Sequence, residues 1–336
     1  MTLDDPRIEV TQQWPISAVH ADPLPRSLAW RRSDVSDANW KIAIPDSCLE
    51  EIAATIAMLR ENPVPVLALS LADVTMPECQ LLMDRVKAAL DHGIGFAVLD
   101  RLPAERHGKA ELLTIYWLLS QMLGRPVAQA FNGTLLYDVH DTGKKTDVRV
   151  RADLTNEDLS WHTDYGFNHP PPYIGLLVLR TALSGGISSV GSLYTGHESL
   201  RERAPELLRR LYEPFVWNRQ GEHPDGAPIC TCNPIFSDHG GTLRARFNRN
   251  LLPVGYRLVD REIDRTGMDA LNAMHEIMSE TENHVDFVLK PGQIQFLNNA
   301  GVTHRRTAFV DHDEPDRKRH LMRIFLRDEG RRSYMG

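Results

Sequence analysis

The sequence changes character near residue 127, and this change most limits the folds open to the chain. Before it, apolar residues recur at helical spacing and predict helices over about 47–61, 76–91 and 104–123. After it, two helices, at about 197–212 and 266–282, interrupt a series of short strand-like runs: 127–138, 173–181, 187–194, 214–218, 227–236, 242–248, 284–290, 293–297 and 320–327. Helices first and strands afterwards indicate the α+β class.

The strand-rich part predicts a jelly-roll core, because many short strands with turn residues between them are typical of that architecture. Residues 1–45 carry little periodicity and predict an irregular arm. The apolar run 64–71 is compatible with a strand, and 95–100 predicts one. We expect 1–125 to form an arm and helices that pack on a core formed by 126–336, together one compact domain.

Composition excludes several classes of protein. A net charge of −7 argues against a nucleic-acid surface, which usually needs a basic face. No run reaches the roughly eighteen apolar residues of a membrane helix, and the acidic N-terminus lacks the apolar region of a secretory signal. The four cysteines fit neither a disulfide framework nor a zinc pattern, which favours a cytoplasmic protein. Assembly into a homo-oligomer is left open.

One stretch of the strand-rich part carries the residue types of a metal site. In Trp161–Asn168, His162 and Asp164 lie two positions apart, and on an extended backbone such side chains point to the same face. They would supply two-thirds of the 2-His-1-carboxylate triad of non-haem Fe(II) oxygenases. The pair alone is also compatible with an aspartate that orients a structural histidine, so the prediction needs a second histidine from elsewhere.

A segment near the C-terminus provides such a histidine. The Pro-Gly pair at 291–292 is a turn signal, and the apolar run after it predicts a strand. Two asparagines at 298–299 then open a segment, predicted to be irregular, that ends at His304. If His304 is not the third ligand, His320 and His312 are the next candidates.

Two arginines follow on the last predicted strand. Arg319 and Arg323 are four residues apart, so an extended backbone places them on one face. Arg319 is suited to a buried carboxylate, because a guanidinium is permanently charged and binds carboxylates in a bidentate manner. The alternative is a surface arginine in a basic run with Arg317 and Lys318.

Together these pieces resemble the TauD/TfdA family of Fe(II)- and 2-oxoglutarate-dependent dioxygenases, which includes gamma-butyrobetaine hydroxylase. Their order and approximate spacing match over about 160–327, whereas the first 120 residues resemble only the longer members, and loosely. The matching pieces are Trp-His162-Thr-Asp164, the turn Gly185-Gly186-Ile-Ser188, the Pro-Gly…Leu-Asn-Asn…His304 segment, and the closing Arg319-His-Leu-Met-Arg323.

The resemblance implies a double-stranded β-helix core with Fe(II) at its mouth. His162, Asp164 and His304 would be the iron ligands. The cosubstrate 2-oxoglutarate would chelate the iron, and Arg319, helped by the Ser188 hydroxyl, would hold its distal carboxylate. O₂ would be the second cosubstrate.

The resemblance also suggests residues that contact the primary substrate. Arg323 would hold an anionic group, although it could equally reinforce the cosubstrate carboxylate. Phe167 and Asn168 directly follow the metal ligands and would line the substrate pocket, with core packing as the alternative for Phe167.

The chain departs from the family after His304. The family often has Gly or Ala there, and this chain has Arg305 and Arg306. The extra charge would either favour an anionic substrate or point outward.

The expected reaction is hydroxylation of an unactivated C–H bond of a small anionic or zwitterionic substrate, with release of succinate and CO₂. Desaturation or cyclisation would need the same ligands and stays open. A non-catalytic barrel that binds a metal or an anion is the rival, but such a protein has no reason to keep three ligands together with Arg319.

The polar segment 139–160 leads directly into the first candidate ligand. A loop of this length inside a compact domain is usually functional or disordered. We expect it either to close over the metal site as a lid, which would exclude water, or to be a plain solvated loop.

Overall fold

The largest sheet forms the centre of the molecule. The computed structural model describes residues 5–10, 17–143 and 152–330. Neighbouring strands of this sheet run antiparallel except β2 and β3, which are parallel. In sheet order the strands are β2 (Lys41–Ala43), β3 (Phe96–Asp100), β15 (Ile294–Asn298), β7 (Tyr173–Arg180), β18 (His320–Arg327) and β4 (Arg125–Val127), with β5 (Tyr137–Val139) also paired to β18.

A smaller antiparallel sheet carries two of the candidate metal ligands. Its order is β14 (His284–Phe287), β9 (Ser188–Ser192), β16 (Val302–Arg306) and β6 (Leu159–His162). Strand β16 pairs with both β9 and β6, and its His304 lies opposite Val190 on one side and His162 on the other. The backbone ladder therefore places the two imidazoles on adjacent strands.

Three short groups of strands complete the β structure. They are the three-stranded sheet β1 (Ile8–Val10), β11 (Cys230–Asn233) and β10 (Phe215–Asn218), the pair β12 (Phe236–His239) and β13 (Thr242–Ala245), and the pair β8 (Ser184–Gly185) and β17 (Phe309–Val310).

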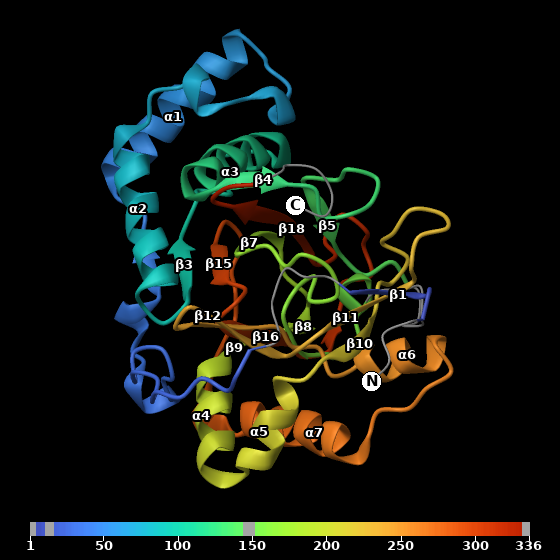
Figure 1. Ribbon diagram of the computed structural model, residues 1–336. Helices are drawn as coiled ribbons and strands as arrows, with labels where there is room; N and C mark the ends of the chain where they lie inside the picture. The colour runs from blue at the N-terminus through green and yellow to red at the C-terminus, as the bar shows by residue number, and fades with distance from the viewer. Residues whose placement is uncertain (1–4, 11–16, 144–151, 331–336) are drawn as a thin grey trace.

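The helices gather in two groups on opposite sides of the strands (Figure 1). The first group comprises α1 (Asp46–Glu61), α2 (Pro77–Asp91) and α3 (Lys109–Leu123), of which α2 and α3 contact the large sheet. The second comprises α4 (Leu193–Arg203), α5 (Pro205–Leu211) and α7 (Arg265–Ser279), with α4 against the small sheet and α6 (Leu251–Leu258) against β10. None of the described helices has the length and apolar content needed to cross a membrane.

Strand β18 shows how the two sides are organised. Met322 and Ile324 belong to the core shared with α1–α3, and Leu321 and Phe325 belong to the core that includes the small sheet. Because side chains alternate across a strand, Arg323 must share the face of Leu321 and Phe325. A strand that is buried on both faces usually has a nearly continuous run of apolar residues. Arg323 is therefore a charged side chain on an otherwise apolar face that is directed toward the small sheet.

The predicted mixture of helices and strands is confirmed, but two local predictions were wrong. The run 64–71 holds two short 3-10 turns, Val66–Ala68 and Leu71–Asp73, because Pro65 fixes the backbone before the first and Ser70 caps the second. The helix predicted over 197–212 is two helices, since Pro205 cannot continue α4 and instead begins α5.

Other differences concern the strands. Helix α6 contains Pro253 and was not predicted. The run 127–138 is extended only at its ends, as β4 and β5. His304 lies within strand β16, just before a shift in its register with β6, where an irregular segment was expected. It is in a strand because β6 and β9 supply hydrogen-bonding partners on both sides. These partners are distant in sequence, so local patterns do not reveal them.

A glycine at the centre of the large sheet tests the packing between the sheet and α3. A Cβ added at Gly175 would lie 2.6 Å from the Tyr116 hydroxyl and 2.9 Å from atoms of both Ile324 and Phe296. Gly175→Ala should therefore lower the free energy of unfolding by about 1–3 kcal/mol through overpacking. Chemical denaturation measures this loss. Gly108→Ala, whose added Cβ would meet nothing within 4 Å, should cost clearly less; equal losses would contradict the packing.

Candidate metal centre

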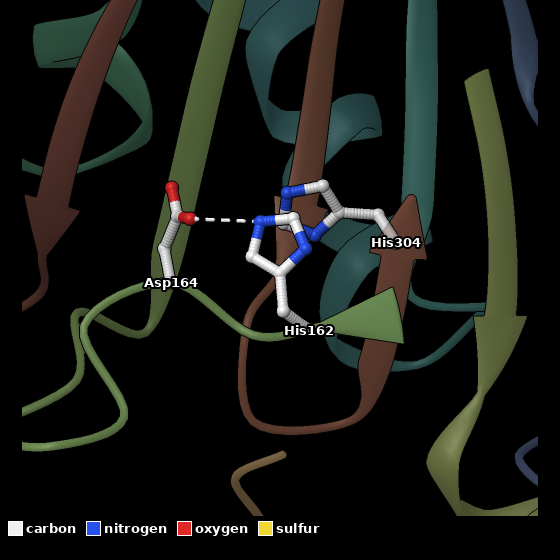
Figure 2. Close-up of side chains that lie close together, drawn as sticks. All are labelled: His162, Asp164 and His304. Atoms are coloured by element: carbon white, nitrogen blue, oxygen red, sulfur yellow. Dashed lines mark ion pairs between the residues drawn. The ribbon is translucent and has the colours of Figure 1, made fainter. Parts of the chain in front are cut away.

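Three side chains from two strands and one turn converge between the sheets. His162 ends β6, Asp164 begins the turn that follows, and His304 lies on β16. Figure 2 shows the three side chains gathered together, with the carboxylate of Asp164 directed at the His162 ring. The potential ligand atoms lie within 4.8 Å of one another, and His162 Nε2 is 3.4 Å from Asp164 Oδ1. Among the described residues, this is the one cluster of three or more His, Cys, Asp or Glu side chains able to hold a metal ion.

The orientation of His162 is fixed by its own strand. Its Nδ1 donates a 2.8 Å hydrogen bond to the Ser160 carbonyl, so Nε2 carries the free lone pair. Metal-binding histidines typically donate their second ring nitrogen in this way. The ring of His304 lies with its centroid 4.2 Å from that of His162.

The backbone of Asp164 is held by a buried amide that sequence reasoning missed. The Asn299 side chain accepts a 2.9 Å hydrogen bond from the Asp164 N–H and donates a bond of the same length to the Asp164 carbonyl. Asn299 belongs to the Asn-Asn pair quoted above, so its motif was recognised, but its contact with a residue so far back in the chain could not be read from spacing.

His304 fits a metal-binding role on two observations. Its Nδ1 is buried and finds no hydrogen-bond partner among the described residues, which is a costly state for a polar atom. Burial and the nearby His162 lower the pKa of His304 to about 3. The imidazole is therefore neutral at pH 7, as a metal ligand must be.

Asp164 is ionised, because the positive charge of a buried arginine compensates its negative charge. Burial raises the pKa of the carboxyl, but the positive charge of the adjacent Arg323 lowers it more, so the net pKa is well below its usual range. One Arg323 nitrogen lies 3.1 Å from both Asp164 and Asp153, and its Nε donates to Gln129. Arg323 thus joins the large sheet to the turn that carries the candidate ligand.

A cavity of about 50 Å³ adjoins this cluster between the two sheets. Arg319 and Ser188 line it together with the three candidate ligands, so the five residues share one cavity. The Arg319 guanidinium lies over the Phe309 ring, 5.1 Å from its centroid, and makes no hydrogen bond to any described residue. Burial, reinforced by Arg306, lowers the pKa of Arg319 to about 9. A buried, unpaired cation facing a cavity is suited to an anion.

The two arginines after His304 differ in their contacts. Arg305 donates to the Ser189 hydroxyl and lies over the Trp161 ring. Arg306 donates to the Thr155 carbonyl and lies over Phe309. Both residues line the metal cavity. The partners of the Arg305 guanidinium, Ser189 and Trp161, alternate along their strands with the cavity-lining Ser188 and His162, so this guanidinium lies on the opposite face of the small sheet.

Two residues assigned to the substrate lie elsewhere. Phe167 packs in the core against Tyr165, and its carbonyl accepts a hydrogen bond from Thr231. Asn168 is fully buried and donates to the Tyr165 hydroxyl and the Glu222 carbonyl. Neither is among the residues that line the metal cavity, and their role in substrate binding stays a prediction.

Other residues line the cavity without having been anticipated. Gln295 lies on β15 opposite Leu176, and Leu176 lies opposite Arg323, so the three form one row across the large sheet. The Gln295 side chain is 2% exposed and makes no hydrogen bond to a described residue. The only sequence feature that could have indicated Gln295 is its polar side chain within the apolar run 293–297. In a strand buried on both faces, such a side chain must point into the interior.

The centre of the proposed lid, 144–151, lies outside the described residues. Its flanks reach the site: Val139, Asp153 and Leu159 line the metal cavity. Closure over the site stays a prediction.

Known proteins are similar in sequence to this chain over most of its length. The profile described as "Taurine catabolism dioxygenase TauD, TfdA family" matches residues 65–325. FR-33289 synthase of Streptomyces rubellomurinus is 31% identical over 318 residues, covering 93% of this chain and 92% of that protein. A taurine hydroxylase-like protein of Stachybotrys chartarum is 22% identical over 324 residues, covering 92% and 81%.

Solved structures share the fold. Asparagine oxygenase in complex with Fe(II), 3-hydroxyasparagine and succinate superposes with a TM-score of 0.61 at 18% identity, over 85% of this chain and 93% of that one. The non-heme iron oxygenase OrfP, in complex with Fe, succinate and (3S)-hydroxy-L-Arg, gives 0.62 at 18% identity, over 86% and 94%.

The family expected from the four sequence motifs is therefore confirmed, and with it the use of Fe(II), 2-oxoglutarate and O₂ that the family shares. The chain belongs to the TauD/TfdA family of non-haem Fe(II)- and 2-oxoglutarate-dependent dioxygenases.

Proposed function

We propose that the protein hydroxylates an unactivated C–H bond of a small anionic or zwitterionic molecule and releases succinate and CO₂. The observation that carries this proposal is the buried cluster of His162, Asp164 and His304, with ligand atoms within 4.8 Å of one another. Two imidazoles and one carboxylate with open positions are the ligand set of non-haem Fe(II) oxygenases.

For the fold, we propose that the two main sheets form a double-stranded β-helix with the metal between them. Their antiparallel pairing and the position of the cluster between the sheets support this. We further propose that residues 1–125 pack as an arm and helices on a catalytic core of 126–336. The four cysteines are free and buried, which supports a cytoplasmic location.

Bound iron, with 2-oxoglutarate and O₂, supplies the oxidising chemistry. One oxygen atom enters the product and the other enters succinate, as the cosubstrate loses CO₂. The chain holds the iron through His162, Asp164 and His304, and it holds the distal carboxylate of the cosubstrate through Arg319 and the Ser188 hydroxyl. The unpaired state of the Arg319 guanidinium supports this role.

Charges around the cavity support an anionic or zwitterionic substrate. Arg306 and Arg319 bring positive charge to its lining, and Asp153, paired with Arg323, brings a carboxylate. The Gln295 amide is a further hydrogen-bonding group for the substrate or the cosubstrate. The hydroxylated amino acids in the asparagine oxygenase and OrfP complexes fit the same class of substrate.

A substrate screen tests the reaction. Protein, Fe(II), 2-oxoglutarate and O₂ are incubated with a panel of free amino acids and small organic acids, and succinate above the substrate-free background identifies a substrate. Under ¹⁸O₂, one labelled atom should appear in succinate and one in the product. A product that lacks two hydrogens and gains no oxygen would indicate desaturation, and an absence of succinate in every reaction would contradict the proposal.

Removal of one histidine should abolish iron binding. His304→Ala should weaken Fe(II) binding by about a hundredfold or more, because even residues that only support metal ligands contribute 10- to 100-fold. Iron retained after anaerobic loading and desalting measures this loss, and succinate formation should disappear with it. His162→Ala should behave alike. His312→Ala is the matched control and should retain iron; full iron retention by His304→Ala would show that the ligand set is wrong.

Arg319 is proposed to hold the cosubstrate, and Arg317, two residues before it, is a matched control. Arg319→Ala should raise the KM for 2-oxoglutarate about a hundredfold, as expected when a buried charge-assisted contact is lost, and should leave bound iron unchanged. Arg317 is exposed and pairs with Glu314, so Arg317→Ala should keep the KM. Equal KM values for Arg319→Ala and the native protein would assign the carboxylate to another residue.

Arg323 compensates the carboxylates of Asp164 and Asp153, so its removal should lower the stability of the protein most when no metal ion is bound. Arg323→Gln should destabilise the metal-free protein by about 3 kcal/mol, because Asp164 and Asp153 lose their common cation. A divalent ion should restore more stability to this variant than to the native protein, since the ion replaces part of the lost positive charge. Thermal unfolding with and without Mn(II) measures both effects. An equal rise in Tm for the two proteins would mean that Arg323 does not compensate Asp164.

A further inference from the structure

A second and larger cavity adjoins the proposed cosubstrate site. This outer cavity measures about 410 Å³ and lies among the end of β7, strand β8 and the loop Val288–Pro291. Its lining shares Ser188, Leu289, Arg319 and Leu321 with the metal cavity, but includes none of the three candidate metal ligands. The shared residues therefore separate the outer cavity from the metal.

The charge of the outer cavity has one sign. Arg180, Lys290 and Arg319 line it, and none of the described acidic residues does. The carboxylate of Asp311 bonds Arg319 only through the backbone N–H, which leaves the guanidinium available on the cavity wall. Cavities lined by one sign of charge concentrate small ions of the opposite sign, so this lining attracts anions.

The rim of the outer cavity is apolar and exposed. Leu183 and Val288 are 61% and 62% exposed, and Ile187 is 36% exposed. These apolar side chains have no hydrogen-bond donors and so cannot hold an anion at the rim. The first groups that can bind an entering anion are the cationic side chains inside the cavity.

We propose that the outer cavity is a separate entrance to the cosubstrate site, through which 2-oxoglutarate enters and succinate leaves without crossing the space of the primary substrate. This inference rests on the proposed function. Arg319 lines both cavities, so the carboxylate that it would hold is the end of the cosubstrate nearest the outer cavity. The cosubstrate could therefore enter with its other end first and leave with this carboxylate first. The metal cavity itself is small, and charged side chains from both sheets crowd it.

An obstruction introduced by labelling tests the entrance. All four native cysteines are buried, so an introduced Val288→Cys can be labelled selectively with a bulky neutral maleimide. Val310→Cys is the matched control, because Val310 is 59% exposed on the adjacent β17 but does not line the outer cavity. Each variant is compared with itself before and after labelling, which separates the effect of the obstruction from that of the substitution.

The readout is binding rather than turnover. Anaerobic stopped-flow absorbance follows the Fe(II)–2-oxoglutarate chelate as it forms, and dilution follows its dissociation. Labelled Val288→Cys should associate and dissociate about tenfold more slowly, with little change in the equilibrium constant, because an obstructed path changes rates and not end states. Labelled Val310→Cys should keep its rates.

Unchanged association in labelled Val288→Cys would overturn the entrance. A loss of equilibrium affinity without slower dissociation would also overturn it, because the label would then disturb the site itself. The failure of the proposed function would look different: no chelate would form in the unlabelled native protein.

Discussion

The pairing of β16 with β6 is the interaction on which the candidate site depends. It aligns His304 with His162 across one antiparallel ladder, although the two residues are distant in sequence. Since side chains alternate along a strand, a slip of one residue would turn His304 to the opposite face. Pairing of β16 with β9 on its other edge holds that register, so the small sheet determines which side chains can reach the metal.

The large sheet contributes charge to the same site. Its strand β18 carries Arg323, which compensates Asp164 and Asp153 and so joins the large sheet to the turn that follows β6 through a buried ionic contact. Replacing one partner of such a contact is costly, because the remaining charge stays buried without compensation. Two of the three candidate ligands thus lie on the small sheet, and the cation that compensates the third ligand, Asp164, lies on the large sheet.

Much of this arrangement could be predicted from the sequence, and the failures have physical causes. Helical periodicity located α1, α2, α3 and α7, because their apolar stripes are local features. The motifs also suggested His162, Asp164, His304, Arg319 and Ser188 as site residues, and the structure brings these five to one cavity. Contacts between distant segments could not be predicted in the same way. The hydrogen bonds of Asn299 with the Asp164 backbone, and those of Arg323 with Asp153 and Gln129, depend on tertiary packing. Phe167 and Asn168 follow the ligands directly in sequence, yet the positive φ of Tyr165 turns the chain at this point, and both residues pack away from the metal cavity.

The central claim is that one site holds iron and 2-oxoglutarate together. Anaerobic absorbance of the native protein with Fe(II) and 2-oxoglutarate tests it most directly, because a bidentate chelate on iron gives a weak visible charge-transfer band and separately bound components do not. We expect the band to appear with saturable dependence on 2-oxoglutarate, to vanish in His304→Ala, and to require far more 2-oxoglutarate in Arg319→Ala. The absence of the band from the native protein, or its persistence at full strength in His304→Ala, would contradict the account.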